Sequence, residues 1–186
     1  MVIIRHVKKL LGRESPIKSA DLDRLSAASG DHRETELRSL LYELAFHNSA
    51  SFVYDELKKP DSVFSELERD AFFQEMLILN FWMMEKVFAR HVENIAGTMH
   101  RHYFGSLPDI EKRAQTLMSR FKTYSLCWDE YTGHHDEFGL KAGQILFGRE
   151  AGYAEKSVSF WIISYTDDSL KKFKKVRKAL AERKII

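Results

Sequence analysis

The sequence contains few of the residues that interrupt helices. Only three of its 186 residues are proline, at positions 16, 60 and 108, and nine are glycine. Proline lacks a backbone N–H and its ring collides with the preceding helical turn, so it usually ends a helix. Because such residues are scarce, long segments can remain helical, and the composition favours helices over a β fold with many turns.

Cysteine and long apolar runs are also nearly absent. The single cysteine, Cys127, excludes an internal disulfide framework and a zinc site built from cysteines alone, and it fits a reducing compartment. The longest apolar run, residues 76–84, contains Asn80 and is shorter than the roughly 20 residues of a membrane-spanning helix. Residues 1–11 carry charges throughout, unlike a signal peptide. We therefore expect a cytoplasmic protein, and a position at the periphery of a membrane is also compatible with the sequence.

Common catalytic motifs are missing as well. The chain has no HExxH, CxxC, GxSxG or GxGxxG sequence. Residues 143–150, GQILFGRE, have the glycine spacing of a P-loop, but Arg149 and Glu150 replace the lysine and hydroxyl residue that bind phosphate and magnesium. No glutamate is followed three residues later by histidine, the pairing of ferritin-like di-metal sites. We predict no catalytic residue and no cofactor.

The residues that are present predict one folded, all-α domain over residues 1–186. Hydrophobic residues make up 44% of the chain, with thirteen phenylalanines and three tryptophans, which is enough for a full core. Residues 70–97 are apolar on all sides in the middle and on one side at the ends, the pattern of a central bundle helix. We expect a single-domain helical bundle of about six or seven helices around a long central helix over residues 62–96.

Further helical segments follow from periodicity and helix-ending signals. The ends of the chain form basic amphipathic helices, and the interior forms additional helices; the expected ranges are 2–11, 31–59, 109–131, 136–147, 154–165 and 169–186. Residues 154–165 are also β-branched and aromatic enough for a strand, but a lone strand would have no partner, so we interpret them as a buried helix. Gly139 and Gly143 lie four residues apart and predict the close approach of another helix.

Charge is distributed unevenly along the chain. Residues 1–20 have a net charge of +4 and residues 169–186 a net charge of +7, which leaves −9 on residues 21–168. The basic residues of the C-terminal segment are the candidate partner- or anion-binding residues: Lys171, Lys172, Lys174, Lys175, Arg177 and Lys178. This helix can bind an acidic protein partner or an anionic membrane, or pack back on the acidic body of its own chain. Nucleic acid is a weaker candidate, because no recognition motif accompanies the charge.

The alternative function is a helical enzyme or carrier with a metal or small-molecule site between helices. Histidines and a glutamate near helix ends supply ligands that suit zinc, iron or manganese: His91, His100, His134, His135 and Glu130. The simpler interpretation is that these are surface and loop residues. Deciding between the two requires the fold, because the residues are far apart in sequence.

A small-molecule pocket is the second alternative. Its candidate residues are Asn80, Trp82, Cys127 and Trp128. Each has a structural interpretation, which we favour: Asn80 as a buried amide with hydrogen-bond partners, Trp82 as core, and Cys127 as a buried thiol beside Trp128. A homo-oligomer is compatible with each of these interpretations.

One segment resembles a known family. Residues 119–148, SRFKTYSLCWDEYTGHHDEFGLKAGQILFG, are loosely similar in their order of arginine, tyrosine, acidic turn and Leu-Phe-Gly end to part of the ubiquinol–cytochrome c chaperone family of helical assembly factors. The resemblance covers under a fifth of the chain and implies no site residue. It adds an assembly function to our main expectation, a non-enzymatic helical binding or adaptor protein whose basic terminal helices contact an acidic partner or anionic surface.

Overall fold

The computed structural model describes residues 17–105, 109–128, 136–148 and 153–186, and these residues form seven helices and no strand. The all-α prediction is confirmed. The helices, in chain order, are α2 (Ser19–Ala27), α3 (Gly30–Leu57), α4 (Arg69–Phe88), α5 (Ile95–Phe104), α6 (Ile110–Cys127), α7 (Asp136–Phe147) and α8 (Tyr153–Glu182). The helix predicted over residues 2–11 lies outside the described residues.

Helix α4 is the hydrophobic axis of the bundle. Thirteen of its twenty residues are buried, and it contacts α3, α5, α6, α7 and α8. Leu77, Phe81 and Met83 are completely enclosed. Contact with helices on all sides explains why the middle of this segment is apolar all round.

The predicted limits of the central helix, residues 62–96, were too wide. Residues 61–68 form turns, and Glu68 begins α4 because its side chain accepts hydrogen bonds from the backbone N–H groups of Asp70 and Ala71, at 3.0 and 2.7 Å. The helix ends at Phe88, and the chain turns before α5. Asn94, with a φ of +47°, precedes α5 in a left-handed conformation that asparagine tolerates better than most residues.

The two C-terminal segments, predicted as separate helices, form one helix of 30 residues, α8. The prediction that residues 154–165 are helical rather than extended is confirmed. Thr166, Asp167 and Asp168 have side chains that can cap a helix and therefore predict a new helix start between the two segments, but Thr166 is buried and the two aspartates face Lys171 at helical spacing. Their ion pairs with Lys171 are compatible with a continuous helix, so the polar residues do not interrupt it.

Helices α7 and α8 pack closely at Gly139. A Cβ atom at this position would lie 2.2 Å from Ser159 Oγ and 2.8 Å from the Ser159 carbonyl oxygen. Only a glycine fits this approach without movement of α8. The close helix contact predicted from Gly139 is therefore present.

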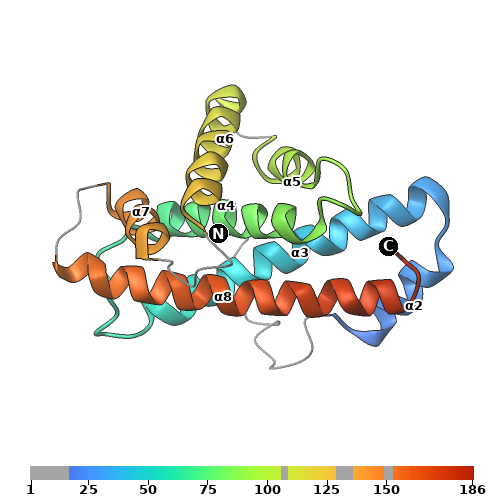
Figure 1. The fold of residues 1–186 in the computed structure, drawn as a ribbon, viewed down its shortest axis with the longest axis horizontal. Helices are drawn as coiled ribbons and strands as arrows, with labels where there is room; N and C mark the ends of the chain where they lie inside the picture. Colours follow the sequence, from blue (N-terminus) through green and yellow to red (C-terminus); the bar gives the residue numbers. More distant parts are fainter. Residues whose placement is uncertain (1–16, 106–108, 129–135, 149–152) are drawn as a thin grey trace.

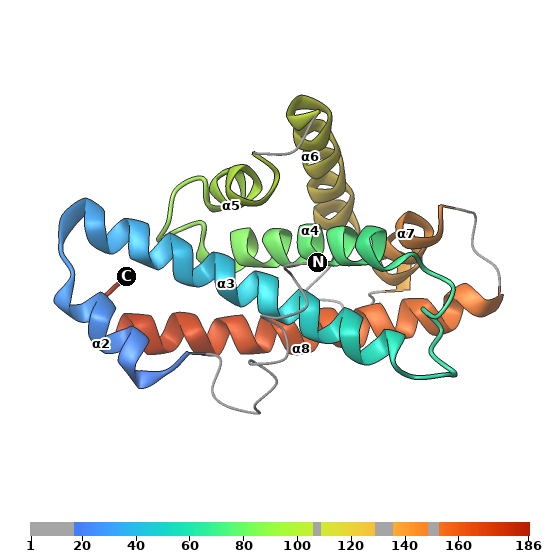
Figure 2. The ribbon, with the colours of Figure 1, turned by 180° about the vertical axis from the view of Figure 1, so that it is seen from behind.

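Figures 1 and 2 show the arrangement of these helices. The long helix α8 runs along the molecule, with α3 and α4 beside it, while α5 and α6 lie on the other side of α4 and α6 points away from the body. The C-terminus lies near α2, where Arg183 forms an ion pair with Asp23. None of the described helices combines the length and apolar character needed to cross a membrane.

Candidate functional site

A polar cluster lies inside the bundle where α3, α4 and α8 meet. Its centre is Asn80, which is fully buried, and its carboxamide oxygen accepts a hydrogen bond from Asn48 Nδ2 at 2.9 Å. The Asn80 amide nitrogen is within bonding distance of Ser49 Oγ, at 2.8 Å, and of Tyr165 Oη, at 2.6 Å. A buried polar group without a hydrogen-bond partner costs free energy. Asn80 has partners on α3, on α8 and on its own helix, α4. The structure thus places Asn80 as a satisfied amide at a helix crossing.

Lys172 extends this cluster toward the surface. Its amine donates a hydrogen bond to Asn48 Oδ1 at 2.9 Å, and its side chain is half-buried. Burial lowers the pKa of Lys172 because the charged amine is removed from water. Burial likewise raises the pKa of the Tyr165 hydroxyl, against the opposing effect of hydrogen bonds from Asn80, Ser169 and Asn48. Both shifts favour the uncharged forms of these two groups.

Trp82 lies in an aromatic cluster between α4, α6 and α7. It is 3% exposed and contacts Tyr124, Trp128 and Phe138, with ring centroids 5.6–5.9 Å apart. Its indole N–H donates a hydrogen bond to Ser125 Oγ at 3.0 Å. Because the rings fill the space around Trp82, this residue and Trp128 lie in the core.

Cys127 is at the end of α6 and is partly buried. Burial raises its pKa, and the neighbouring carboxylate of Glu137 raises it further. A reactive thiol requires a lowered pKa, so the surroundings of Cys127 favour the neutral thiol. The nearby candidates His134 and His135 lie outside the described residues.

The predicted metal ligands that the structure describes do not form a site. In residues 17–105, 109–128, 136–148 and 153–186, no three His, Cys, Asp or Glu side chains are grouped to hold a metal ion. His91 is exposed in the turn after α4, whereas His100 is 5% exposed on α5, and burial lowers the pKa of its imidazole. The remaining candidates, Glu130, His134 and His135, lie outside the described residues, so a site involving them stays a prediction.

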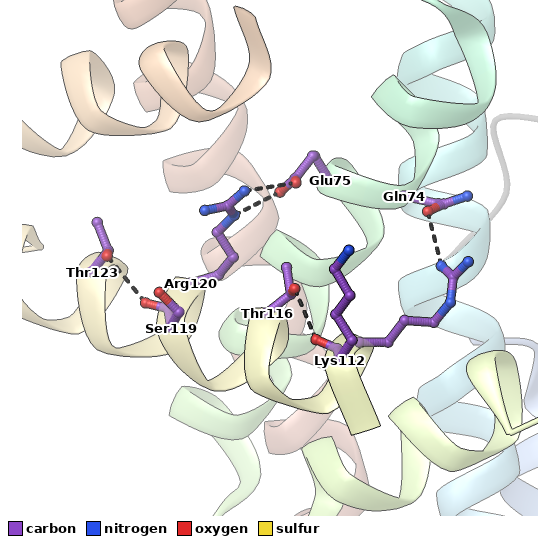
Figure 3. Close-up of polar contacts among 8 residues, drawn as sticks. Gln74, Glu75, Lys112, Thr116, Ser119, Arg120 and Thr123 are labelled. Atoms are coloured by element: carbon purple, nitrogen blue, oxygen red, sulfur yellow. Dashed lines mark hydrogen bonds and ion pairs between the residues drawn. The ribbon is translucent and has the colours of Figure 1, made fainter. Parts of the chain in front are cut away.

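A cleft of about 380 Å3 lies between α6 and α7. It is lined by Arg120, Thr123, Lys141, Gln144, Ile145 and Gly148. Arg120 is held by Glu75 of α4 through two contacts of 3.2 and 3.1 Å, and the Thr123 hydroxyl donates to the Ser119 carbonyl (Figure 3). Arg120 and Thr123 are therefore engaged within the protein, and Lys141 and Gln144 are the other polar side chains of the lining.

The basic residues predicted on residues 169–186 divide into two sets. Lys172 points into the polar cluster, and half-buried Arg177 donates to the Val87 carbonyl at 3.4 Å, so neither belongs to an outer surface. Four others are exposed on the outer side of α8: Lys171, Lys174, Lys175 and Lys178. The opposite side of this half of α8 is buried through Leu170, Phe173, Val176 and Leu180. The helix therefore packs on its own body through its apolar side and keeps a row of lysines outside.

Two of these four lysines have acidic neighbours on the same helix. Lys171 pairs with Asp167 at 2.6 Å, and this hydrogen-bonded pair raises the pKa of Lys171. Lys178 lies 3.8 Å from Glu182. Exposed pairs of this kind contribute little to stability and break easily, so they do not prevent Lys171 and Lys178 from binding other anions. We refer to Lys171, Lys174, Lys175 and Lys178 as the lysine row.

Sequence reasoning missed two features of these surfaces. The first is the position of Asn48 and Tyr165 beside Asn80, which depends on long-range helix packing. The second is the exposed aromatic pair Phe160 and Trp161 on α8, at 67% and 42% exposure. We expected this segment to be buried, but only Val158, Ile162 and their helical neighbours face the core. A helical projection of the continuous helix would have separated the two sides.

The fold and surfaces define an all-α bundle protein built around a buried central helix. Comparison of the chain with protein-family models, curated proteins and solved structures found no match. The similarity of residues 119–148 to the ubiquinol–cytochrome c chaperone family is thus a local resemblance, and no residue role is taken from it.

Proposed function

We propose that this is a non-enzymatic helical binding or adaptor protein that uses the lysine row of α8 to dock on an anionic surface. The observation that supports the proposal is the division of α8 into a buried apolar side and an exposed basic side. The core fixes the helix, so the lysines are held in a row rather than carried on a flexible tail.

The charge pattern also supports docking through α8. Lys174 and Lys175 are adjacent exposed residues, and Lys171 and Lys178 lie one turn before and one turn after them on the same side. Several lysines on one surface attract anions and speed association, an effect that salt screens within about 10 Å at moderate ionic strength. The described residues show no grouped metal ligands, and in the cleft between α6 and α7 Arg120 is bound to Glu75 and Thr123 to the Ser119 carbonyl, so the lysine row is the more concrete basis for a function.

The test is charge reversal rather than deletion. Removing residues 169–186 would also remove buried Leu170, Phe173 and Leu180 and would disrupt the core. The double variant Lys174→Glu, Lys175→Glu changes exposed residues only. Its matched control is Lys112→Glu, Lys122→Glu on α6, which makes the same charge change at two other exposed lysines.

We expect the wild-type chain to be retained on immobilised polyglutamate and on anionic vesicles, with retention falling as salt is raised. The α8 double variant should bind at least tenfold more weakly than the α6 control, because each lysine near an anionic surface contributes roughly 1 kcal/mol. Equal weakening in both variants would show that only net charge matters, and it would contradict a docking role for α8.

A further inference from the structure

The exposed aromatic pair on α8 extends the proposed docking surface. Phe160 and Trp161 are 67% and 42% exposed, and their rings are in edge contact with centroids 6.3 Å apart. Most large apolar residues of this chain are buried, so two adjacent exposed aromatic side chains are unusual here. They form one apolar projection on a convex helix surface.

Two basic side chains, Lys59 and Lys156, lie beside this projection. The amine of Lys59, at the end of α3, lies 5.5 Å from the ring centroid of Trp161, and Lys58 lies 3.8 Å from the ring of Tyr54. Lys156 is exposed one turn before Phe160 on α8. Among the carboxylates on this part of the chain, Glu56 is buried and binds the Lys59 amine and the Ser62 hydroxyl, whereas Asp55 and Asp61 are exposed. Lys59 and Lys156 thus place two exposed amines close to the aromatic pair.

The continuity of α8 places this projection and the lysine row on the same side. Phe160 and Lys178 are 18 residues apart, which is five full turns and about 27 Å along the axis. Lys171 lies close to the same line, three turns after Phe160. One surface of α8, which runs along the molecule in Figures 1 and 2, thus carries aromatic rings at one end and lysines at the other, with Asp167 and Asp168 between them paired to Lys171.

We propose that the anionic surface bound by α8 is a phospholipid bilayer, with Phe160 and Trp161 inserted among the headgroups and the lysine row on lipid phosphates. This inference rests on the proposed function and names its partner. Tryptophan favours the boundary between headgroups and acyl chains, and lysine can place its alkyl stem on apolar surface while its amine reaches phosphate. A protruding aromatic pair on a long exposed helix fits a broad, deformable surface, whereas a protein partner would need a groove of matching length.

Trp161 provides a direct spectroscopic test, because the other two tryptophans, Trp82 and Trp128, are 3% and 7% exposed. The full chain is titrated with vesicles of phosphatidylcholine alone or mixed with phosphatidylserine. We expect a blue shift of tryptophan emission with the mixed vesicles, and quenching by lipids brominated on the acyl chain. Trp161→Phe should abolish both signals.

The variant Phe160→Ser tests insertion, and Leu126→Ser is the matched control because Leu126 is 76% exposed on α6. We expect about tenfold weaker vesicle binding for Phe160→Ser and no change for Leu126→Ser, in line with the transfer of one phenylalanine from water. Both variants alter exposed residues, and thermal unfolding checks that each is folded.

The outcomes separate the two proposals. Binding to polyglutamate but not to anionic vesicles would show that the partner is an acidic protein, which overturns the bilayer inference and leaves the proposed function. Vesicle binding that Phe160→Ser does not weaken would restrict docking to the lysine row and would also overturn insertion. Failure to bind either anion would refute the proposed function itself.

Discussion

The polar cluster around Asn80 yields a prediction about stability that can be worked out from the hydrogen bonds. In Asn80→Ala, Asn48 loses an acceptor at 2.9 Å, and Ser49 and Tyr165 each lose a donor at 2.8 and 2.6 Å. Each buried hydrogen bond has a net value of about 1 kcal/mol, and a small cavity replaces the amide. We expect unfolding to require about 2–4 kcal/mol less free energy in Asn80→Ala than in the wild-type chain.

Remaining contacts limit this loss. Tyr165 Oη still accepts from Asn48 Nδ2 at 2.9 Å, and Ser49 Oγ still donates to the Ala45 carbonyl at 2.8 Å. The surviving partners therefore keep at least one hydrogen bond each. For this reason we expect a weakened but folded protein rather than loss of the fold.

The assay is urea unfolding followed by far-UV circular dichroism at neutral pH. Ser164→Ala, at an exposed position of α8, serves as the control and should stay within about 0.5 kcal/mol of the wild type. A double-mutant cycle of Asn80→Ala with Tyr165→Phe should give a coupling energy of at least about 0.5 kcal/mol, since the two side chains are in contact. A loss below about 1 kcal/mol, with no coupling, would refute the view that the cluster stabilises the meeting point of α3, α4 and α8.

Two further predictions concern packing and pH. Gly139→Ala should destabilise the protein by about 1–3 kcal/mol, because the new methyl group meets the backbone oxygen of Ser159 at 2.8 Å, and an unchanged melting temperature would contradict this close contact. Burial raises the pKa of Tyr42 to about 12 and also raises that of Tyr103, whereas an unfolded tyrosine ionises near pH 10. In the folded state the two tyrosines therefore remain protonated to a higher pH than in the unfolded state. The stability that these tyrosines contribute is complete below about pH 10 and falls as the pH rises toward 12. Urea midpoints measured from pH 8.5 to 11.5 should decrease less steeply in Tyr42→Phe, even though the lowered pKa of Lys172 acts in the opposite direction.

The sequence predicts the fold class because apolar periodicity is a local property. The apolar run around Asn80 identified α4 as the central helix, and Gly139 indicated where a second helix approaches closely. The helix limits were less predictable: Glu68 is an unusual helix-capping residue, and Asp167 and Asp168 pair within a helix that they were expected to begin. The residue at which a helix begins or ends depends on competition between local capping and the burial of neighbouring residues.

The candidate site was predictable only in part. The basic composition of residues 169–186 identified α8 as a charged surface, but composition does not reveal which lysine faces inward. Lys172 turns to Asn48, a residue 124 positions away in sequence, and no local pattern encodes that contact. The exposure of Phe160 has the same origin, because it depends on which side of α8 the other helices cover.

The contrast between α4 and α6 has a consequence for how the molecule opens. Helix α4 buries thirteen of twenty residues, whereas α6 buries only Leu117 and Tyr124 among eighteen. Local unfolding is cheapest where few apolar contacts are lost, so α6 is expected to separate from the bundle without global unfolding. Its amide hydrogens would then exchange with solvent faster than those of α4, and the protein would consist of a slowly exchanging three-helix unit of α3, α4 and α8 with a second, more easily opened layer on one side.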